Sequence, residues 1–319
     1  MNVLILNDTS RELGHLGCEL VMKNLYTLLE ANKVKKIITI KDIDEKYDRD
    51  EFNKILENID FVILNGEGTL HHDRGEGLFK RCQQAKDKNK KIYLINSVWQ
   101  DNNENYKYLN LFNKIYVRES LSFQEIKKHN ISNVKVVPDL LFYDIKKKSQ
   151  LEISNRILVT DSVILEKTSY LLDAYLKLPK DTRFCFMGYW NKDLVKKTFY
   201  IRYVRAFFRA KKNMKCLLTE MDIMQYSFVL TGRFHAVCLC IKYLIPFLAT
   251  QSNTHKIEGL LKDIGVDFSK YILNDIGGLD NKNIYLDNVD RQFFKKYSED
   301  AQLKIHEMFQ EIFNDFLDV

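Results

Sequence analysis

The chain has 319 residues, 45% of them hydrophobic and 29% charged, and a formal net charge of +6. This length exceeds what one hydrophobic core usually holds, so we expect two domains, and the balanced composition excludes a disordered chain. The modest positive charge suits an anionic partner, and the absence of any nucleic-acid motif argues against a nucleic-acid-binding protein.

Short apolar runs alternate with helical patterns from the first residue onward. The strands predicted in the first half are residues 2–6, 34–40, 60–65, 91–96, 114–118 and 134–137. Apolar residues at helical spacing after the first strand, and again around residues 52–56, predict helices. Strands separated by helices are typical of a parallel sheet with right-handed crossovers.

A polar, lysine-rich segment from Tyr143 to Ser154 interrupts this alternation. We place the domain boundary there, with an N-terminal Rossmann-like domain of residues 1–148 on the acceptor side and a C-terminal Rossmann-like domain of residues 149–319 on the donor side. Strand-like runs resume at residues 156–160, 183–187, 228–232 and 246–250, and an amphipathic helix over residues 291–316 closes the chain.

This order of elements predicts an α/β fold with mostly parallel sheets. Two successive halves of similar length indicate two Rossmann-like domains that face each other across a cleft, which is a GT-B-like arrangement. The ligand of such a protein lies at the carboxyl ends of the strands.

The cysteines predict a reduced protein. None of the six forms a CxxC pair and most lie in apolar runs, so we expect buried thiols and no structural zinc site. The N-terminus has no basic region of a signal peptide, and no apolar run is long enough to span a membrane. We therefore expect a cytoplasmic protein. The cysteines are Cys18, Cys82, Cys185, Cys216, Cys238 and Cys240.

The loop after the first strand, residues 7–19 (NDTSRELGHLGCE), has the composition of a strand-to-helix ligand loop. Asp8, Thr9, Ser10 and His15 are candidates for contact with a substrate. Thr9 and Ser10 serve equally well if they only cap and order the loop, and the residues alone leave both interpretations open.

The segment 65–73 (NGEGTLHHD) follows a predicted buried strand. Gly66 and Gly68 would let the backbone approach a ligand closely, although the spacing matches neither a P-loop nor a dinucleotide fingerprint. Glu67 between them is a candidate general acid or base. Adjacent histidines on a helix point apart and no third ligand is evident, so we expect His71 and His72 to form hydrogen bonds and predict no metal site.

Arg118 ends a predicted strand, and Asp139 follows the next one along the chain. An arginine at the carboxyl edge of a sheet suits an anionic ligand. Asp139 has two possible roles, chemistry or an ion pair with Arg118, and the pairing is slightly favoured.

The segment from Val195 to Lys215 mixes aromatic residues with cations. Such a helix can rest on an anionic membrane, although a core helix with a solvated basic edge is the commoner case. Contact with a membrane or with a lipid-linked glycan therefore stays a minority expectation.

The most informative segment is TGRFHAV, residues 231–237, where a buried strand runs into a helix. A strand end, the turn at Gly232 and a helix N-terminus together form an anion pocket. Arg233 can clamp a carboxylate or phosphate, and His235 can exchange protons near neutral pH. The competing interpretation is that Arg233 pairs with a structural carboxylate and His235 caps the helix.

A second polar segment, residues 252–256 (SNTHK), follows the next predicted strand. Ser252 and Lys256 are candidates to bind a phosphate, and Thr254 is a plausible N-cap of the helix that follows. For Lys256, a place in the site and a solvated surface position are about equally favoured.

Together these segments resemble the polysaccharide pyruvyl transferase family. The resemblance runs over about residues 1–265, and NGEGTL, VRESLSFQEI, VVPDLLF, TGRFHAV and SNTHK carry it, with TGRFHAV the most specific. The family implies a GT-B-like fold and the transfer of a pyruvyl unit from phosphoenolpyruvate to sugar hydroxyls of cell-surface glycans such as capsule or lipopolysaccharide. The implied reaction forms a ketal and requires no metal or organic cofactor.

The resemblance also implies roles for individual residues. Arg118, Arg233 and Lys256 match basic residues that would hold the anionic donor, and His235 would serve as general acid. Glu67 stands where the family usually has a run of glycines, and the first loop departs from the family's glycine-asparagine pattern. These departures leave the identity of the donor open.

Two further functions stay open. The first is a GT-B glycosyltransferase that uses a CMP-activated ulosonic acid of the Kdo or sialic acid type, with Asp139 as nucleophile and Glu67 as acid/base. The second is a non-catalytic protein that binds a glycan or nucleotide. The presence of a proton donor, His235, argues against the second.

Overall fold

The computed structural model describes residues 1–10, 15–40, 48–144, 154–187, 200–210, 218–273 and 286–317, leaving out the side chains of residues 154, 155 and 200–202. The predicted boundary between residues 148 and 149, the thiol of residue 216 and both ends of the aromatic basic segment lie outside the described residues. The chain divides into two compact units, which we call the first and second units. The first contains residues 1–10, 21–143 and 300–319, and the second contains residues 11–20 and 144–299.

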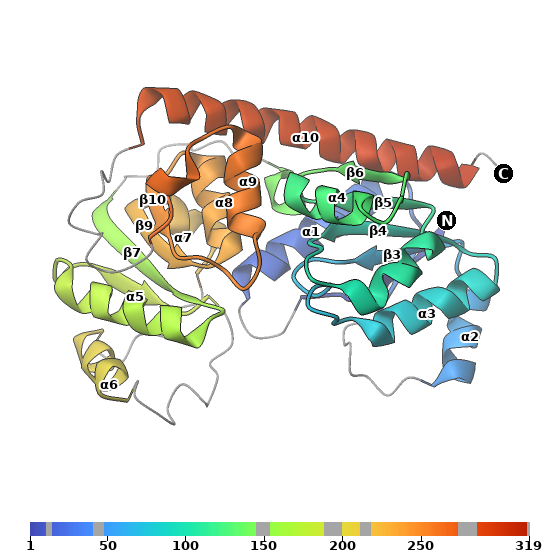
Figure 1. The fold of residues 1–319 in the computed structure, drawn as a ribbon, viewed down its shortest axis with the longest axis horizontal. Coiled ribbons are helices and arrows are strands. Elements are labelled where there is room, and N and C mark those ends of the chain that lie inside the picture. The colour runs from blue at the N-terminus through green and yellow to red at the C-terminus, as the bar shows by residue number, and fades with distance from the viewer. Residues whose placement is uncertain are drawn as a thin grey trace. The chain divides into compact units, whose positions relative to one another are not determined.

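The first unit is built on a six-stranded sheet with the order β2-β1-β3-β4-β5-β6, in which every pair of neighbours is parallel. Figure 1 labels β3, β4, β5 and β6 of this sheet. Its strands are β1 (Asn2–Leu6), β2 (Lys36–Ile40), β3 (Phe61–Asn65), β4 (Lys91–Ser97), β5 (Lys114–Val117) and β6 (Val134–Val136). Its helices are α1 (Leu16–Ala31), α2 (Arg49–Glu57), α3 (Glu76–Asp87) and α4 (Ser120–Lys127), with short 3-10 turns η1 (Asn103–Leu111) and η2 (Leu140–Phe142). Residues 16–20, the start of α1, group with the second unit.

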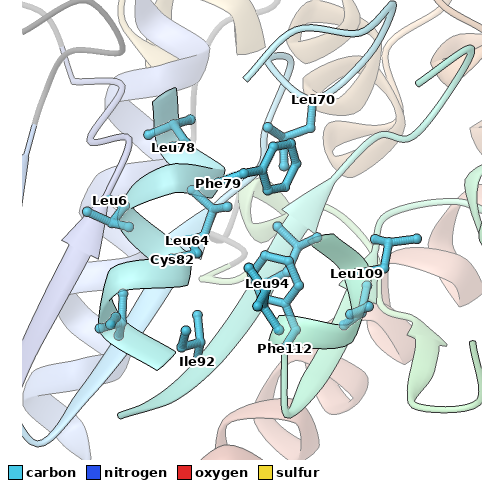
Figure 2. Packing of buried hydrophobic residues seen from close by; sticks show 14 of the residues in the cluster. Leu6, Leu64, Leu70, Leu78, Phe79, Cys82, Ile92, Leu94, Leu109 and Phe112 are labelled. Carbon is cyan, nitrogen blue, oxygen red and sulfur yellow. The ribbon is translucent and has the colours of Figure 1, made fainter. Parts of the chain in front are cut away.

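The core of the first unit explains why its strands are nearly continuous apolar runs. A parallel sheet is covered on both faces, so residues of both parities are buried. β3 is buried along its whole length, and Leu64 packs with Phe79 and Cys82 of α3 and with Leu94 of β4 (Figure 2). The longer apolar runs seen in the sequence are therefore the buried centre of this sheet.

The second unit has a four-stranded sheet with the order β10-β9-β7-β8, again parallel throughout its described pairs. Its strands are β7 (Ser154–Ser162), β8 (Arg183–Cys185), β9 (Tyr226–Gly232) and β10 (Phe247–Ala249). Its helices are α5 (Leu165–Lys177), α6 (Tyr200–Arg209), α7 (Glu220–Met224), α8 (Phe234–Tyr243) and α9 (Lys256–Ile264), with a 3-10 turn η4 (Phe268–Lys270). The last helix, α10 (Asn288–Leu317), starts in the second unit and ends in the first.

The sheets confirm the predicted α/β class with parallel strands. The two units do not follow from a single division of the chain into two halves. Residues 11–20 group with the second unit, and residues 300–319 group with the first. In the first unit Phe61 stacks edge-on against Phe313, and Lys114 forms an ion pair with Glu311, so the end of α10 completes that unit.

The cysteines depart from expectation at one position. Cys18, Cys82, Cys238 and Cys240 are reduced thiols, the last three of them buried, as the sequence predicts. Cys185, however, is disulfide-bonded, so the prediction that every cysteine is reduced is wrong there.

Candidate functional site

Each sheet has one point where the strand order reverses, and both points are lined by polar residues. In the first unit the reversal lies between β1 and β3, and in the second between β7 and β9. In open α/β sheets such a switch point, at the carboxyl ends of the strands, is the usual place for a ligand.

At the edge of the first unit, Asn7 follows β1 and Asn65 ends β3. The Asn7 amide donates to the carbonyl oxygen of Asn65 at 2.7 Å and to the hydroxyl of Thr69 at 3.2 Å. The Asn65 amide donates back to the carbonyl oxygen of Asn7 at 3.3 Å. This reciprocal pair joins the two strand ends and fixes the loops that follow them.

Glu67 lies within this network and is only 3% exposed. Its carboxylate accepts hydrogen bonds from the Thr9 hydroxyl and, at 3.3 Å, from the Asn65 amide. Its φ of 27° is in the left-handed region that residues with a side chain rarely adopt. The surrounding hydrogen bonds hold this unfavourable backbone, so a defined position of the carboxylate is built into the loop.

Asp8 orders the first loop. One carboxylate oxygen accepts from the backbone N–H of Ser10 at 2.9 Å and from its hydroxyl at 2.6 Å. The other accepts from the Tyr26 hydroxyl at 2.7 Å. Burial, with the added effect of this hydrogen bond to Asp8, raises the pKa of Tyr26 above its ordinary value. The ordering role considered for this loop is therefore present, through Asp8 and Ser10.

The two glycines of the second loop have different surroundings. A Cβ at residue 66 would lie 2.5 Å from the Cβ and Oγ of Ser97, so Gly66 is required by packing against the end of β4. A Cβ at residue 68 would meet no atom within 4 Å. Only Gly68 therefore borders open space, and it is the better candidate for a close approach of a ligand.

His71 and His72 lie in a loop and not on a helix, so the expectation that they point apart is wrong. Their rings meet edge to face at 4.9 Å between centroids, with their Nδ1 atoms 2.7 Å apart. The Nε2 atom of His71 lies 3.0 Å from the carbonyl oxygen of Gly68. These contacts are of the hydrogen-bonding kind that the sequence predicts for His71.

Arg118 and Asp139 form a buried ion pair in the first unit. Their side chains are 2% and 1% exposed, and the distance from Nη1 to Oδ2 is 2.9 Å. The other oxygen of Asp139 accepts the backbone N–H of Leu141 at 2.9 Å, which makes Asp139 the N-cap of η2. The ion pair with Arg118 that the sequence suggests for Asp139 is thus observed. Next to Asp139 in the chain, the backbone N–H of Leu140 donates to Asn96 Oδ1 of β4 at 3.1 Å.

At the edge of the second unit, β7 and β9 meet through small polar residues. The hydroxyls of Thr160 and Thr231 lie 2.6 Å apart, and Thr231 accepts the backbone N–H of Arg233 at 2.9 Å. A Cβ at Gly232 would overlap the side chain of Ser162 and come within 2.8 Å of its Cα. Glycine is therefore required at position 232, where the end of β9 pairs with the end of β7.

Arg233 is the N-cap of α8 and is held by Asp161, the residue before the end of β7. Its Nε donates to Asp161 Oδ1 at 2.9 Å and its Nη2 donates to Oδ2, which gives a two-point ion pair. The same Oδ1 accepts the N–H of Met187 at 2.9 Å. The Arg233 side chain is 12% exposed and that of Asp161 4%, so this pair reaches the surface to an extent that the first unit's pair does not.

His235 is the second residue of α8 and is 8% exposed. The competing interpretation is observed for Arg233, which pairs with the buried carboxylate of Asp161, and it is wrong for His235, because the N-cap of α8 is Arg233. His15, which we expected to act with Asp8, Thr9 and Ser10, belongs to the second unit instead, and its ring meets that of His235 edge to face at 6.3 Å between centroids.

Lys256 is the first residue of α9 and only 6% exposed, so it is not a solvated surface lysine. Its ammonium group donates to Asn253 Oδ1 at 2.8 Å, and the Ser252 hydroxyl lies 3.2 Å from the same oxygen. The N-cap of α9 is His255, so the prediction that Thr254 caps this helix is wrong by one residue.

Two site residues escaped the sequence analysis. Asp161 and Asn65 each lie at the carboxyl end of a buried strand, and a polar residue in that position is the signal that could have found them. Nothing local in the sequence says that Asp161 pairs with Arg233, because the pairing of β7 with β9 brings them together.

The aromatic basic segment is described only over residues 200–210. There α6 buries Tyr203 and Ala206 in the core of the second unit, and Arg209 donates to carbonyl oxygens after α5, including that of Leu178 at 2.7 Å. Phe208 is 67% exposed. Within the described part of the chain, no helix combines the length and the apolar character that crossing a membrane requires.

Comparisons with known proteins agree with this architecture. A sequence model of the polysaccharide pyruvyl transferase family matches residues 15–252. No curated protein sequence matches the chain. Similar solved structures include an uncharacterized protein from Klebsiella pneumoniae, with 17% identity over 86% of this chain and 93% of that one and a TM-score of 0.51.

Two further similar structures have names that mention UDP-N-acetylglucosamine, or UDP together with GlcNAc. A putative UDP-N-acetylglucosamine 2-epimerase from Listeria monocytogenes has 11% identity over 94% of this chain and 90% of its own, with a TM-score of 0.57. A pneumococcal O-GlcNAc transferase in complex with UDP and GlcNAc has 13% identity over 83% of this chain and 59% of its own, with a TM-score of 0.51. At these identities the likeness concerns the fold, and it confirms the predicted GT-B-like class of two Rossmann-like units.

Proposed function

The chain belongs to the polysaccharide pyruvyl transferase family and is a transferase, and from this premise we propose that it moves a pyruvyl group from phosphoenolpyruvate to sugar hydroxyls of a bacterial cell-surface glycan such as capsule or lipopolysaccharide. The observation that carries the proposal is the two-point pair of Arg233 with Asp161 at the switch point of the second sheet, with His235 two residues further on.

Phosphoenolpyruvate carries a carboxylate and a phosphate, and the second unit has cationic groups suited to both. Arg233 is a planar donor held in place by Asp161 at the N-terminus of α8, where backbone N–H groups and the helix dipole also favour an anion. Lys256 stands at the N-terminus of α9, steadied by Asn253. In the proposal Arg233 and Gly232 bind the carboxylate, and Lys256 with Ser252 binds the phosphate that leaves.

The proposed chemistry balances with one general acid. His235 donates a proton to the methylene carbon C3 of phosphoenolpyruvate, and the first sugar hydroxyl adds its oxygen to C2 and releases its proton. The C2–O bond to phosphate then breaks, and the second hydroxyl adds to C2 and releases its proton. The products are the ketal and inorganic phosphate, and the two released protons return one to His235 and one to the phosphate.

The first unit would supply the acceptor side of the proposal. Glu67, whose carboxylate accepts hydrogen bonds from Thr9 and Asn65, is the candidate that would orient an attacking hydroxyl by accepting a hydrogen bond from it. The acceptor-binding candidates that the sequence predicts are Asp8, Thr9, Ser10, His15, Gly66, Gly68 and His71. Arg118 belongs to the proposed donor set only if its pair with Asp139 opens, because that pair is buried.

The test is a set of thermal unfolding measurements with phosphoenolpyruvate, CMP, CDP and UDP. A ligand at about 100 times its Kd stabilises the folded state by about 2.7 kcal/mol, so phosphoenolpyruvate should raise the Tm of the wild type. Arg233→Lys should lose this rise, whereas Arg205→Lys, at an exposed position of α6, should keep it. Stabilisation by CMP without any by phosphoenolpyruvate would overturn the proposal in favour of a CMP-ulosonate glycosyltransferase.

The glycosyltransferase alternative gains nothing from the position of Asp139. Its nucleophile must reach a sugar carbon, but Asp139 is 1% exposed and bonded to Arg118 and to the N–H of Leu141. The non-catalytic alternative would be supported if glycan binding persisted while no phosphate was released from phosphoenolpyruvate with any acceptor.

Peripheral membrane contact through Val195 to Lys215 remains part of the proposal. Phe208 is the exposed aromatic side chain among the described residues of this segment, since Tyr203 is buried and Phe207 is partly buried. Co-sedimentation with anionic vesicles should fall for Phe208→Ser and stay unchanged for Phe268→Ser, a matched exposed phenylalanine on η4. Equal sedimentation of the two variants would argue against the contact.

A further inference from the structure

Three side chains of types that can bind transition metals, two histidines and a cysteine, lie close together in the second unit. His15 directly precedes α1, Cys18 lies in the first turn of α1, and His235 lies in the first turn of α8. Each offers one ligand atom, and these atoms all lie within 4.8 Å of one another. Among the described residues this is the one such group of histidine, cysteine and acidic side chains found.

The backbone is shaped for this meeting. A Cβ at residue 17 would overlap the ring and Cβ of His235, so only glycine lets α1 and the His235 side chain approach so closely. Gly17 is the second residue of α1. The φ angle of Gly17 is not positive, so the backbone conformation does not require glycine at this position. The close approach of the His235 side chain does require it.

The ligand chemistry points to a zinc-like ion. Two imidazole nitrogens and a thiolate are the donors that Zn²⁺ and its neighbours in the first transition row prefer, and three protein ligands leave a fourth tetrahedral position open. With metal–ligand bonds of about 2.0–2.3 Å, the ligand atoms of such a site lie about 3.3–3.6 Å apart. In the observed group the ligand atoms lie within 4.8 Å of one another. Rotation of the side chains would have to bring these atoms about 1 Å closer together to reach the spacing of a metal site.

Access and charge also suit the ion. His15 and Cys18 are partly exposed while His235 is buried, so one side of the group is open to solvent. Helix N-termini favour anions, so the position of Cys18 in the first turn of α1 favours its thiolate, which is the form that binds a metal.

We propose that His15, Cys18 and His235 bind a divalent ion of the zinc class, and that the bound ion prevents His235 from donating a proton. The first part is independent of the proposed function, and the second part rests on it. An imidazole that binds a metal through one nitrogen cannot also be the doubly protonated imidazolium, which is the form that acts as a general acid near neutral pH. Zinc would therefore inhibit the transferase reversibly.

Binding is tested on metal-stripped full-length protein with Co²⁺ as the probe. One equivalent of Co²⁺ should produce the thiolate-to-cobalt charge-transfer absorption of a cysteine ligand, and Zn²⁺ should displace it. Cys18→Ser should abolish this absorption and weaken Zn²⁺ binding by more than the roughly 10–100-fold that outer-shell changes cost. Cys238→Ala, which removes a buried thiol of α8, and His129→Asn, which removes a histidine of the first unit, should bind like the wild type.

The results separate the two parts of the inference. A charge-transfer band that survives in Cys18→Ser, or no band in folded wild type, would overturn the site. If the band appears but phosphoenolpyruvate is never turned over, the site stands and the proposed function fails. If turnover occurs, Zn²⁺ should inhibit the wild type and inhibit Cys18→Ser at least tenfold less strongly, and a loss of activity on metal stripping would overturn the inhibitory role. Circular dichroism of each variant establishes that it is folded.

Discussion

Both units have a glycine packed against a serine and an arginine–aspartate ion pair at the carboxyl ends of their strands, and the two ion pairs differ in solvent exposure. In each, a glycine packs on a serine of the neighbouring strand, Gly66 on Ser97 and Gly232 on Ser162. Each also has an arginine paired with an aspartate. The pair in the first unit is 2% and 1% exposed, whereas that in the second is 12% and 4% exposed.

This difference shows that an arginine at the end of a strand is not by itself a ligand residue. Arg118 and Arg233 occupy equivalent positions in the sequence pattern, each after a buried strand. The guanidinium of Arg118 lies in the interior with its counterion, whereas that of Arg233 keeps contact with solvent while Asp161 fixes its plane. We therefore expect the first edge to matter most for stability and the second most for chemistry.

The largest expected effect is on turnover at the second edge. His235→Gln keeps the bulk of the buried side chain but removes the proton donor, so kcat of metal-stripped protein should fall by about 10²–10⁴-fold. The Tm should change little, because the glutamine side chain would occupy similar space. The measurement is phosphate release from phosphoenolpyruvate, with His129→Gln in the first unit as the control. A collapsed fold, or unchanged kcat, would assign His235 to structure.

The next effect is on stability at the first edge. Arg118→Ala leaves the carboxylate of Asp139 buried without its counterion, so the free energy of unfolding should fall by about 3–5 kcal/mol in urea denaturation. Arg233→Ala should cost clearly less, because solvent reaches that pair. The double variant Arg118→Met with Asp139→Leu should recover much of the loss. Equal losses for the two single variants would remove the distinction between the edges.

The sheets were predictable from the sequence because each parallel strand is buried on both faces. Runs such as residues 61–64 (FVIL) and 228–230 (FVL) therefore stand out from their polar surroundings. The loops at the strand ends were predictable for the same reason, and with them the positions of Glu67, Arg233 and Lys256 after buried strands. The strand bounds differ from the predicted ones by only a few residues, since ends fray into turns.

What could not be predicted depends on contacts between distant parts of the chain. His15 and Cys18 are visibly one helical turn apart, but nothing local in the sequence brings His235 beside them. The role of Gly17 is equally hidden, because it is explained by a ring that the fold places against it. Similarly, Arg118 and Arg233 differ in burial only through the elements packed around them. Local patterns thus predict where site residues stand, while tertiary contacts decide what they touch.

A smaller effect separates the glycines of the two edges. Gly66→Ala and Gly232→Ala should each lower the free energy of unfolding by about 1–3 kcal/mol, since the added methyl group collides with a serine and its backbone. Gly68→Ala should cost little, because open space surrounds that position. Replacing Ser97 by glycine in the Gly66→Ala protein should restore part of the loss. If Gly68→Ala were as damaging as Gly66→Ala, the packing explanation would be wrong.

A further expected effect is a pH dependence confined to the first unit. Burial alone would raise the pKa of Glu311, but hydrogen bonds from Lys114, Lys135 and Tyr116 outweigh it and lower the pKa to about 2. A carboxyl group with a lowered pKa in the folded state stabilises the protein above its unfolded pKa of about 4.3, and this contribution is lost as the pH falls towards 2.

The wild type should therefore lose stability between about pH 4.5 and pH 2 through this group, and Glu311→Gln should have a lower Tm at pH 6 and a flatter decline with acid. Glu307→Gln, at an exposed position four residues earlier on α10, should follow the wild-type profile. Thermal unfolding from about pH 6 to pH 2.5 makes the measurement. Parallel profiles for Glu311→Gln and the wild type would show that the Glu311 cluster does not hold the end of α10 to the strands of the first unit.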